Sequence, residues 1–144
     1  MDNPPGPNEL NLNYPAKFCA LHAALEAIED ACNAWKIDIS LVSRARIVVE
    51  ELFSNTIKYG YGEECKMPVR LSLRPLPQLT LVYEDEAPPF NPLTWTAGPH
   101  NALPLEERRP GLAGIALVIG LSATASFERR DGVNRLTMTF AQES

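Results

Sequence analysis

The sequence predicts an α+β fold of two layers, in which helices pack on one face of a mixed, mostly antiparallel sheet. The prediction depends on the order of the patterns: a strand, two helices, two strands, a long loop, a helix and two strands. The length of 144 residues indicates one domain, and 45% hydrophobic with 22% charged residues is typical of a globular protein. We expect a disordered lead at 1–8 and a single domain at 9–144.

Residues 9–15 alternate between polar and apolar side chains, which predicts a short strand at the sheet edge. From 16 to 35, apolar residues recur at steps of three and four, the spacing of one helix face. These residues are Phe18, Leu21, Leu25, Ile28 and Cys32. The domain therefore begins with a strand followed by a helix.

A second helix is predicted at 40–59, with Ser40 as its N-cap. Gly60 and Gly62 are its stop signal, because glycine readily adopts the left-handed conformation that ends many helices. The apolar positions of this segment again follow a helical spacing, so one face of the helix should be buried.

The second half of the chain is mostly strand. Residues 67–75 and 78–85 alternate as strands do, and a proline-rich loop, interpreted as a lid, follows at about 86–111. An apolar helix is predicted at 112–122, and an Asp-Gly pair at 131–132 predicts a closing hairpin.

Charge and composition exclude several classes of protein. The net charge of −5 argues against direct binding to nucleic acid. No apolar run approaches the roughly 20 residues of a membrane span, and the polar, proline-rich start is unlike a signal peptide. The cysteines Cys19, Cys32 and Cys65 match neither a zinc site nor a disulfide framework. We therefore expect a cytoplasmic protein with reduced thiols.

Glu51 and Asn55 stand four residues apart in the second predicted helix and so share one of its faces, beside the buried one. A carboxylate and an amide oxygen are hard ligands suited to Mg²⁺, and a carboxylate can accept a proton from a hydroxyl. The alternative is a solvated helix face, because such a pair is common by chance.

Asp85 ends a predicted strand, where its carboxylate could accept a hydrogen bond from an exocyclic amine such as the 6-amino group of adenine. The alternative is a turn residue that caps backbone N–H groups. The position alone does not decide between these two roles.

The stretch RPGLAGIALV places Gly111 and Gly114 at the start of the last predicted helix. Glycines there let backbone N–H groups approach an anion, which the helix dipole also favours. Arg108 and Arg109 precede the helix and could bind the same phosphates. The alternative is a loop-to-helix turn whose glycine allows close packing.

In this order and spacing, the three motifs resemble those of the Bergerat-fold ATPases, the superfamily that includes the ATP-binding domains of gyrase and histidine kinases. EELFSNTIKYGYG looks like the N-box, EDEAPPFNP like the first glycine box and GLAGIALV like the second. The resemblance extends over about 16–140. The form of the first box and the ending RRDGVNRLTMTF most resemble the anti-sigma-factor serine kinases of bacterial partner-switching systems.

The resemblance implies roles for the matching residues. Glu51 would be the general base, Asn55 would bind the Mg²⁺ that bridges the ATP phosphates, and Asp85 would bind the adenine amine. Gly111 and Gly114 would admit the phosphates. The remaining nucleotide-contacting positions are Lys58, Tyr59, Ala87, Phe90, Arg109 and Leu112.

Two of these positions depart from the family pattern, because Ala87 and Leu112 stand where the family usually has glycine. Ala87 precedes Pro88, and a residue before proline is pushed towards extended geometry, so a left-handed conformation is not expected there. The side chain of Leu112 could block close approach of the backbone to the phosphates.

The resemblance implies an ATP-binding serine/threonine protein kinase that uses Mg²⁺ and acts as an anti-sigma factor or similar partner-switching regulator. Its substrate would be a Ser of an anti-anti-sigma (STAS-type) protein. A sigma factor is a second candidate partner, and the branch commonly forms homodimers.

Two alternatives remain. A histidine-kinase catalytic domain acting in trans is disfavoured, because no two-helix dimerisation segment precedes the domain and because His22 and His100 fall in the first helix and the loop. A degenerate nucleotide-binding or purely protein-binding regulator without catalysis is motivated by Ala87 and Leu112.

Overall fold

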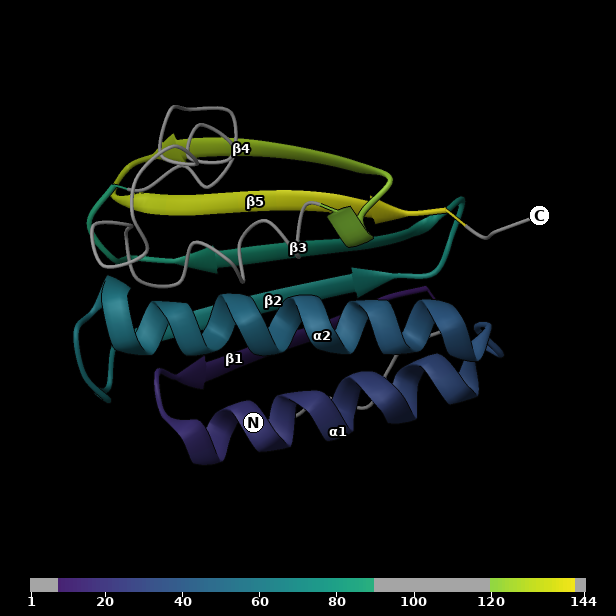
Figure 1. Cartoon of the computed structure of the whole chain (residues 1–144), viewed down its shortest axis with the longest axis horizontal. Coiled ribbons are helices and arrows are strands. Elements are labelled where there is room, and N and C mark those ends of the chain that lie inside the picture. Colours follow the sequence, from purple (N-terminus) through teal and green to yellow (C-terminus); the bar gives the residue numbers. More distant parts are fainter. Residues whose placement is uncertain (1–7, 90–119, 142–144) are drawn as a thin grey trace, which may run out of the picture.

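The structure, a computed structural model, describes residues 8–89 and 120–141. These residues form a five-stranded sheet in the order β1-β2-β3-β5-β4 (Figure 1). The strands are β1 Leu10–Pro15, β2 Pro68–Arg74, β3 Leu79–Asp85, β4 Thr124–Arg130 and β5 Val133–Phe140. Each of the four strand pairs is antiparallel, so the sheet of the described residues is antiparallel throughout, whereas the sequence predicted a mixed, mostly antiparallel sheet.

Two α-helices, α1 (Phe18–Ala34) and α2 (Ile39–Asn55), lie side by side on one face of the sheet (Figure 1). Helix α1 packs against α2 and β1, and α2 also contacts β3. Each helix buries a stripe of small and aliphatic residues at helical spacing, which begins with Ala20 and Leu21 in α1 and with Leu41 and Val42 in α2. The predicted two-layer α+β architecture is therefore confirmed.

The helices cover one face of the sheet because the strands alternate. In β3 the buried positions are every second residue from Leu79 to Asp85, and β5 follows the same pattern from Asn134 to Phe140. The register places Tyr83 of β3 opposite Leu136, so buried side chains form rows across the sheet. The core thus lies between this face and the two helices.

The other face of the sheet carries a row of alternating charges. Arg70, Glu84, Arg135 and Glu128 are successive neighbours across β2, β3, β5 and β4. Glu84 accepts from Nε of Arg135 at 2.7 Å and from Nε of Arg70 at 3.4 Å. Opposite charges are therefore neighbours along the row, as expected for a sheet face that is in contact with water.

Several local predictions are confirmed. The first strand is at the sheet edge next to β2, and α1 falls within the predicted 16–35. The closing hairpin turns at Asp131 and Gly132, whose φ angles of 53° and 80° are those of the left-handed region that such turns require. Strands β2 and β3 fall within the predicted 67–75 and 78–85.

The second helix differs from the prediction at both ends. It begins at Ile39 with Asp38 as N-cap, and the hydroxyl of Ser40 donates to the Asp38 carboxylate at 2.9 Å instead of capping the helix. The α-helix ends at Asn55, and a π-helical turn continues over Thr56–Gly60. The predicted glycine stop is confirmed, because Gly62 follows with a φ of 88°.

Some predictions fall on other parts of the chain. Most of the predicted lead at 1–8, the lid beyond Pro89 and the helix at 112–122 lie outside the described residues, apart from two helical residues, Gly120 and Leu121. Within the described segments, no helix has the length and apolar character needed to cross a membrane.

Candidate functional site

The last turn of α2 presents the predicted polar pair. Glu51 and Asn55 are both partly exposed and lie one turn apart on the same helix, beside the buried stripe that ends in Leu52 and Phe53. Within residues 8–89 and 120–141, neither side chain has a hydrogen-bond or ion-pair partner. Both are therefore available to a ligand.

The carboxyl group of Asp85 lies at the end of β3, on the face covered by the helices, and the residue is only 8% exposed. Its Oδ2 accepts from the hydroxyl of Thr56 at 2.7 Å. Its Oδ1 accepts from Nδ2 of Asn134 at 2.9 Å and from the backbone N–H of Ala87 at 3.2 Å. A buried carboxyl group is expected to be hydrogen-bonded in this way.

Thr56 links this carboxyl group to the helix layer. Its Oγ1 lies 2.6 Å from the hydroxyl oxygen of Tyr83 and 3.0 Å from the carbonyl oxygen of Leu52. A hydroxyl has one proton, and a carboxylate is the strongest acceptor nearby, so the Thr56 proton is directed to Asp85. Tyr83 then donates its own proton to Thr56 or to Leu52, whose carbonyl oxygen is 3.1 Å away.

Tyr83 is suited to this donor role. Complete burial raises the pKa of its hydroxyl well above the usual value, and the nearby Asp85 charge raises it further. The hydroxyl therefore keeps its proton throughout the physiological pH range. The order Tyr83, Thr56, Asp85 is a chain of donors that ends on the carboxylate.

Ala87, which replaces a family glycine, is buried and fits closely against the π-helical turn. A Cβ atom built on Gly60 would lie 3.0 Å from the Cβ of Ala87, so the two backbones can approach only because residue 60 has no side chain. Ala87 is not among the described residues with a positive φ, as its place before Pro88 predicts. At this contact Ala87 carries the methyl group, and Gly60 on the facing segment carries no side chain.

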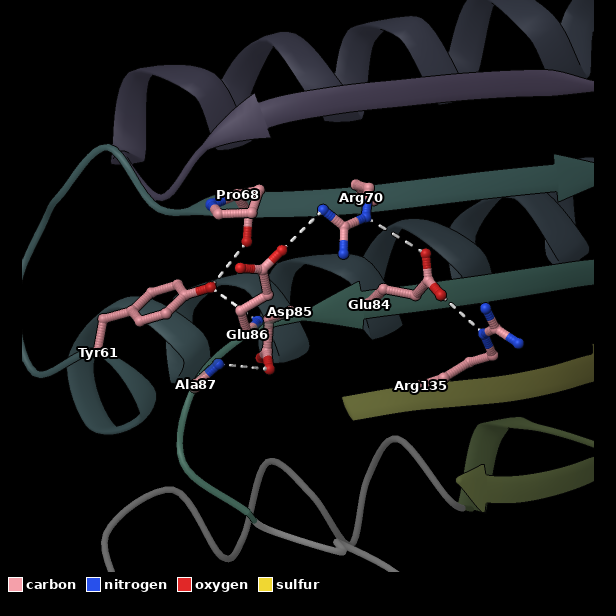
Figure 2. A network of polar contacts seen from close by, with 8 residues as sticks. All are labelled: Tyr61, Pro68, Arg70, Glu84, Asp85, Glu86, Ala87 and Arg135. Carbon is pink, nitrogen blue, oxygen red and sulfur yellow. Dashed lines mark hydrogen bonds and ion pairs between the residues drawn. The ribbon is translucent and has the colours of Figure 1, made fainter. Parts of the chain in front are cut away.

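Tyr61 fixes the ends of the neighbouring strands (Figure 2). Its hydroxyl donates to the carbonyl oxygen of Pro68 at 2.9 Å, at the start of β2, and accepts from the backbone N–H of Glu86 at 2.8 Å, just after β3. Burial raises the pKa of Tyr61 to about 12, so it remains a donor at neutral pH. The residue directly after Asp85 is thereby held in place.

The carboxylate of Asp85 retains capacity for one more donor. A carboxylate offers about four acceptor positions. The described residues fill two positions on Oδ1, from Ala87 and Asn134, and one on Oδ2, from Thr56. Within the described segments, one acceptor position on Oδ2 has no donor.

The structure thus connects two of the predicted elements, because Thr56 follows Asn55 in the chain and contacts Asp85. Lys58 and Tyr59 are exposed on the π-helical turn and have no side-chain partner among the described residues. The other predicted site residues lie outside the described segments: Phe90, Arg108, Arg109, Gly111, Leu112 and Gly114.

Several residues of this cluster were not predicted from the sequence: Thr56, Tyr61, Tyr83, Arg129 and Asn134. A usable signal existed for two of them. Tyr83 and Asn134 share the parity of the apolar, inward-facing positions of β3 and β5, so a polar group at either position must find a buried partner.

The family of the chain follows from comparison with known proteins. The family model described as histidine kinase-like ATPase domain matches residues 14–140. Among the described elements, this range contains both α-helices, strands β2 to β5, the last two residues of β1 and every residue of the cluster around Asp85. No curated protein matches the sequence.

Solved structures share the fold at low sequence identity. The RsbU and RsbW domains of Rv1364c from Mycobacterium tuberculosis match with a TM-score of 0.64 and 13% identity, over 92% of this chain. This chain spans 32% of the length of that one. The SiaB-SiaC complex from Pseudomonas aeruginosa matches with a TM-score of 0.54 and 14% identity, over 91% of this chain and 88% of that chain.

Proposed function

Because the chain belongs to the histidine kinase-like ATPase domain family, we propose that it is an ATP-binding protein kinase that phosphorylates a Ser or Thr of a small partner protein. Its role would be that of an anti-sigma or other partner-switching regulator. The observation that carries the proposal is the buried Asp85 carboxylate, which accepts from three donors and has one acceptor position without a donor in the part of the chain that the structure describes. Such a group recognises a ligand N–H at a fixed point.

The residues present fit a nucleotide with its cation. Asp85 would accept the exocyclic N–H of adenine, and the Asn55 side chain would supply an oxygen to Mg²⁺ next to the phosphates. Exposed Lys58 adds a positive charge on the same turn of the chain. Bound ATP with Mg²⁺ would supply the transferable phosphoryl group and screen its charge.

Glu51 would act on the partner's hydroxyl. Its carboxylate lies one helical turn before Asn55, is partly exposed and has no described partner, so it can receive a proton from a Ser or Thr hydroxyl that approaches from solvent. The α2 helix holds Glu51 and Asn55 at a fixed spacing, which positions base and cation ligand together.

The proposed partner is a small anti-anti-sigma domain of the STAS type, with a sigma factor as a second partner. Two findings support this class. The motifs resemble those of anti-sigma-factor kinases, and the similar structures are an RsbW domain, beside an RsbU domain, and a complex of two proteins, SiaB and SiaC. A homodimer is proposed on the resemblance alone.

The alternative is a regulator that binds proteins without catalysis, suggested by Ala87 and Leu112. The contact of Ala87 with Gly60 accommodates the first departure without a distorted backbone. This favours a working adenine pocket over a degenerate one. Leu112, the second departure, lies outside the described residues. The choice between the two functions therefore depends on the experiments below.

The test is transfer of labelled phosphate from ATP to a candidate STAS-type partner, with Glu51→Gln and Glu50→Gln compared. Glu50 is the neighbouring carboxylate but is exposed, so it controls for the loss of one negative charge. We expect Glu51→Gln to lower transfer by about 10²-fold or more and Glu50→Gln to leave it unchanged. Equal transfer by both variants would refute the base assignment.

Binding is tested separately by titration with ATP and with purine riboside triphosphate, which lacks the 6-amino group. Asp85→Asn should weaken ATP binding and leave the affinity for the analogue nearly unchanged. An equal loss for both ligands would argue against adenine recognition by Asp85. No binding of ATP at millimolar concentration would favour the non-catalytic regulator.

A further inference from the structure

We propose that Arg129 and Asn134 form a positioning clamp that sets the adenine selectivity of Asp85. The inference rests on the proposed function and adds two residues to it. Both come from the C-terminal hairpin, Arg129 from β4 and Asn134 from β5, and they are cross-strand neighbours in the register. The motifs recognised in the sequence include neither residue in a nucleotide-binding role.

The first step is the orientation of the Asn134 amide. The guanidinium NH1 of Arg129 lies 2.8 Å from Oδ1 of Asn134. A guanidinium can only donate, so the atom facing it must be the amide oxygen. The amide NH₂ group therefore points the other way, towards Oδ1 of Asp85 at 2.9 Å. Arg129 thus determines that Asp85 meets a donor and not a second acceptor.

The second step is the turn after Asp85. The carbonyl oxygen of Ala87 accepts from Nδ2 of Asn134 at 3.0 Å and from NH1 of Arg129 at 3.0 Å. The carbonyl oxygen of Pro88 lies 3.3 Å from the same Nδ2. Arg129 and Asn134 thereby hold the turn after Asp85, in which residue 87 is alanine and not the more flexible glycine.

The third step is the consequence for recognition. With Asn134 and the Ala87 N–H on Oδ1, the remaining acceptor position is confined to Oδ2, beside Thr56. A ligand must then present an N–H at that one point. A purine with a 6-amino group does so, whereas a 6-oxo purine presents an acceptor against an acceptor.

The clamp is tested with Asn134→Leu, which keeps the number and branching of the side-chain heavy atoms, and with Arg129→Gln. The matched control is Arg130→Gln, the next residue of β4, whose side chain is 79% exposed and pairs only with Asp131 among the described residues. Affinities for ATP and for purine riboside triphosphate are measured by calorimetric titration. A thermal melt of each variant accompanies the titrations, to register any loss of fold.

We expect both clamp variants to weaken ATP binding by about five- to tenfold and to leave the analogue within about twofold, so that the preference for the 6-amino group falls. Arg130→Gln should keep the preference. A purely structural role would lower both affinities equally. Clamp variants that bind ATP with the full preference would overturn the inference and leave the proposed function intact.

A second measurement needs no nucleotide. Amide hydrogen exchange at Ala87, followed by NMR, should accelerate by about tenfold in Asn134→Leu and Arg129→Gln and stay unchanged in Arg130→Gln. Unchanged exchange in all three variants would overturn the positioning role. Failure of the parent chain to bind ATP would overturn the proposed function, and with it the selectivity role of the clamp.

Discussion

Gly60 and Ala87 lie so close together that a Cβ atom on Gly60 would be 3.0 Å from the Cβ of Ala87. Real carbon atoms that are not bonded rarely approach so closely, so a side chain at residue 60 would require Ala87 to shift by a few tenths of an ångström. The π-helical turn and the turn after β3 are thus matched in shape.

We predict that Gly60→Ala destabilises the protein by about 1–3 kcal/mol, because the added methyl group must displace Ala87 and its turn. Chemical denaturation measures the change. The control is the double variant Gly60→Ala with Ala87→Gly, in which the methyl group moves from one segment to the other. The double variant should recover most of the lost stability, and additive losses would show that the contact is unimportant.

Thr56→Val keeps the shape of the side chain and removes the donor to Asp85. We expect it to lower the free energy of unfolding by about 1–3 kcal/mol, because a buried carboxylate loses a partner. Thr137→Val is the control, since Thr137 has the same branched shape but lies on the uncovered face of β5. Equal effects of the two substitutions would contradict a special role for Thr56.

Tyr83→Phe tests the donor chain itself. Loss of the hydroxyl should cost about 1–2 kcal/mol in unfolding free energy, since it lies 2.6 Å from the Thr56 oxygen and 3.1 Å from the Leu52 carbonyl oxygen and both lose this partner. In a double-mutant cycle with Thr56→Val, the two losses should be coupled by about 1 kcal/mol. A coupling near zero would mean that the two hydroxyls act independently on their surroundings.

Alkaline pH should destabilise the protein through Cys32. Burial raises the pKa of this thiol from 9.0 to about 11. Between these values the folded thiol keeps its proton while the unfolded thiol loses it, so the stabilisation present below pH 9.0 is lost as pH rises through about 11. We expect a loss of about 2–3 kcal/mol across this window.

The check is urea denaturation of the parent chain and of Cys32→Ala across that pH range. The substitution lowers stability at every pH because it leaves a cavity, but its curve should fall less steeply above pH 9.0. Tyr61, whose pKa is raised from 10.0 to about 12, titrates in both proteins and cancels in the comparison. Parallel curves would show that Cys32 does not contribute.

Local patterns predicted most of the described fold, because apolar spacing predicted both α-helices and strands β1 to β3, and the Asp131-Gly132 pair predicted the hairpin of β4 and β5. They also placed Asp85 at the end of β3 and Glu51 and Asn55 on one helix face. The reason is physical: a helix or strand with one buried face has apolar residues at the period of that element, and this period can be read from the sequence.

The parts that escaped prediction depend on contacts between distant residues. The first N–H of α1, at Phe18, is capped by the carboxylate of Glu64, 46 residues away. The π-helical turn has Tyr61 N–H bonded to the Thr56 carbonyl oxygen at 2.8 Å, and Thr56 and Tyr61 are themselves held by β3 and the residues around it. No local pattern contains this information, since the partner lies elsewhere in the chain.

The pairing of Asp85 with Asn134 spans 49 residues and depends on β5 lying next to β3. Contacts of such long separation form slowly, because the loop between them must lose its freedom first. The hydrogen-bonded Asp85 carboxylate, which we propose binds adenine, is therefore assembled only when the last hairpin has joined the sheet. During synthesis of the chain, competence to bind nucleotide would then appear abruptly, after strand β5 has emerged and paired.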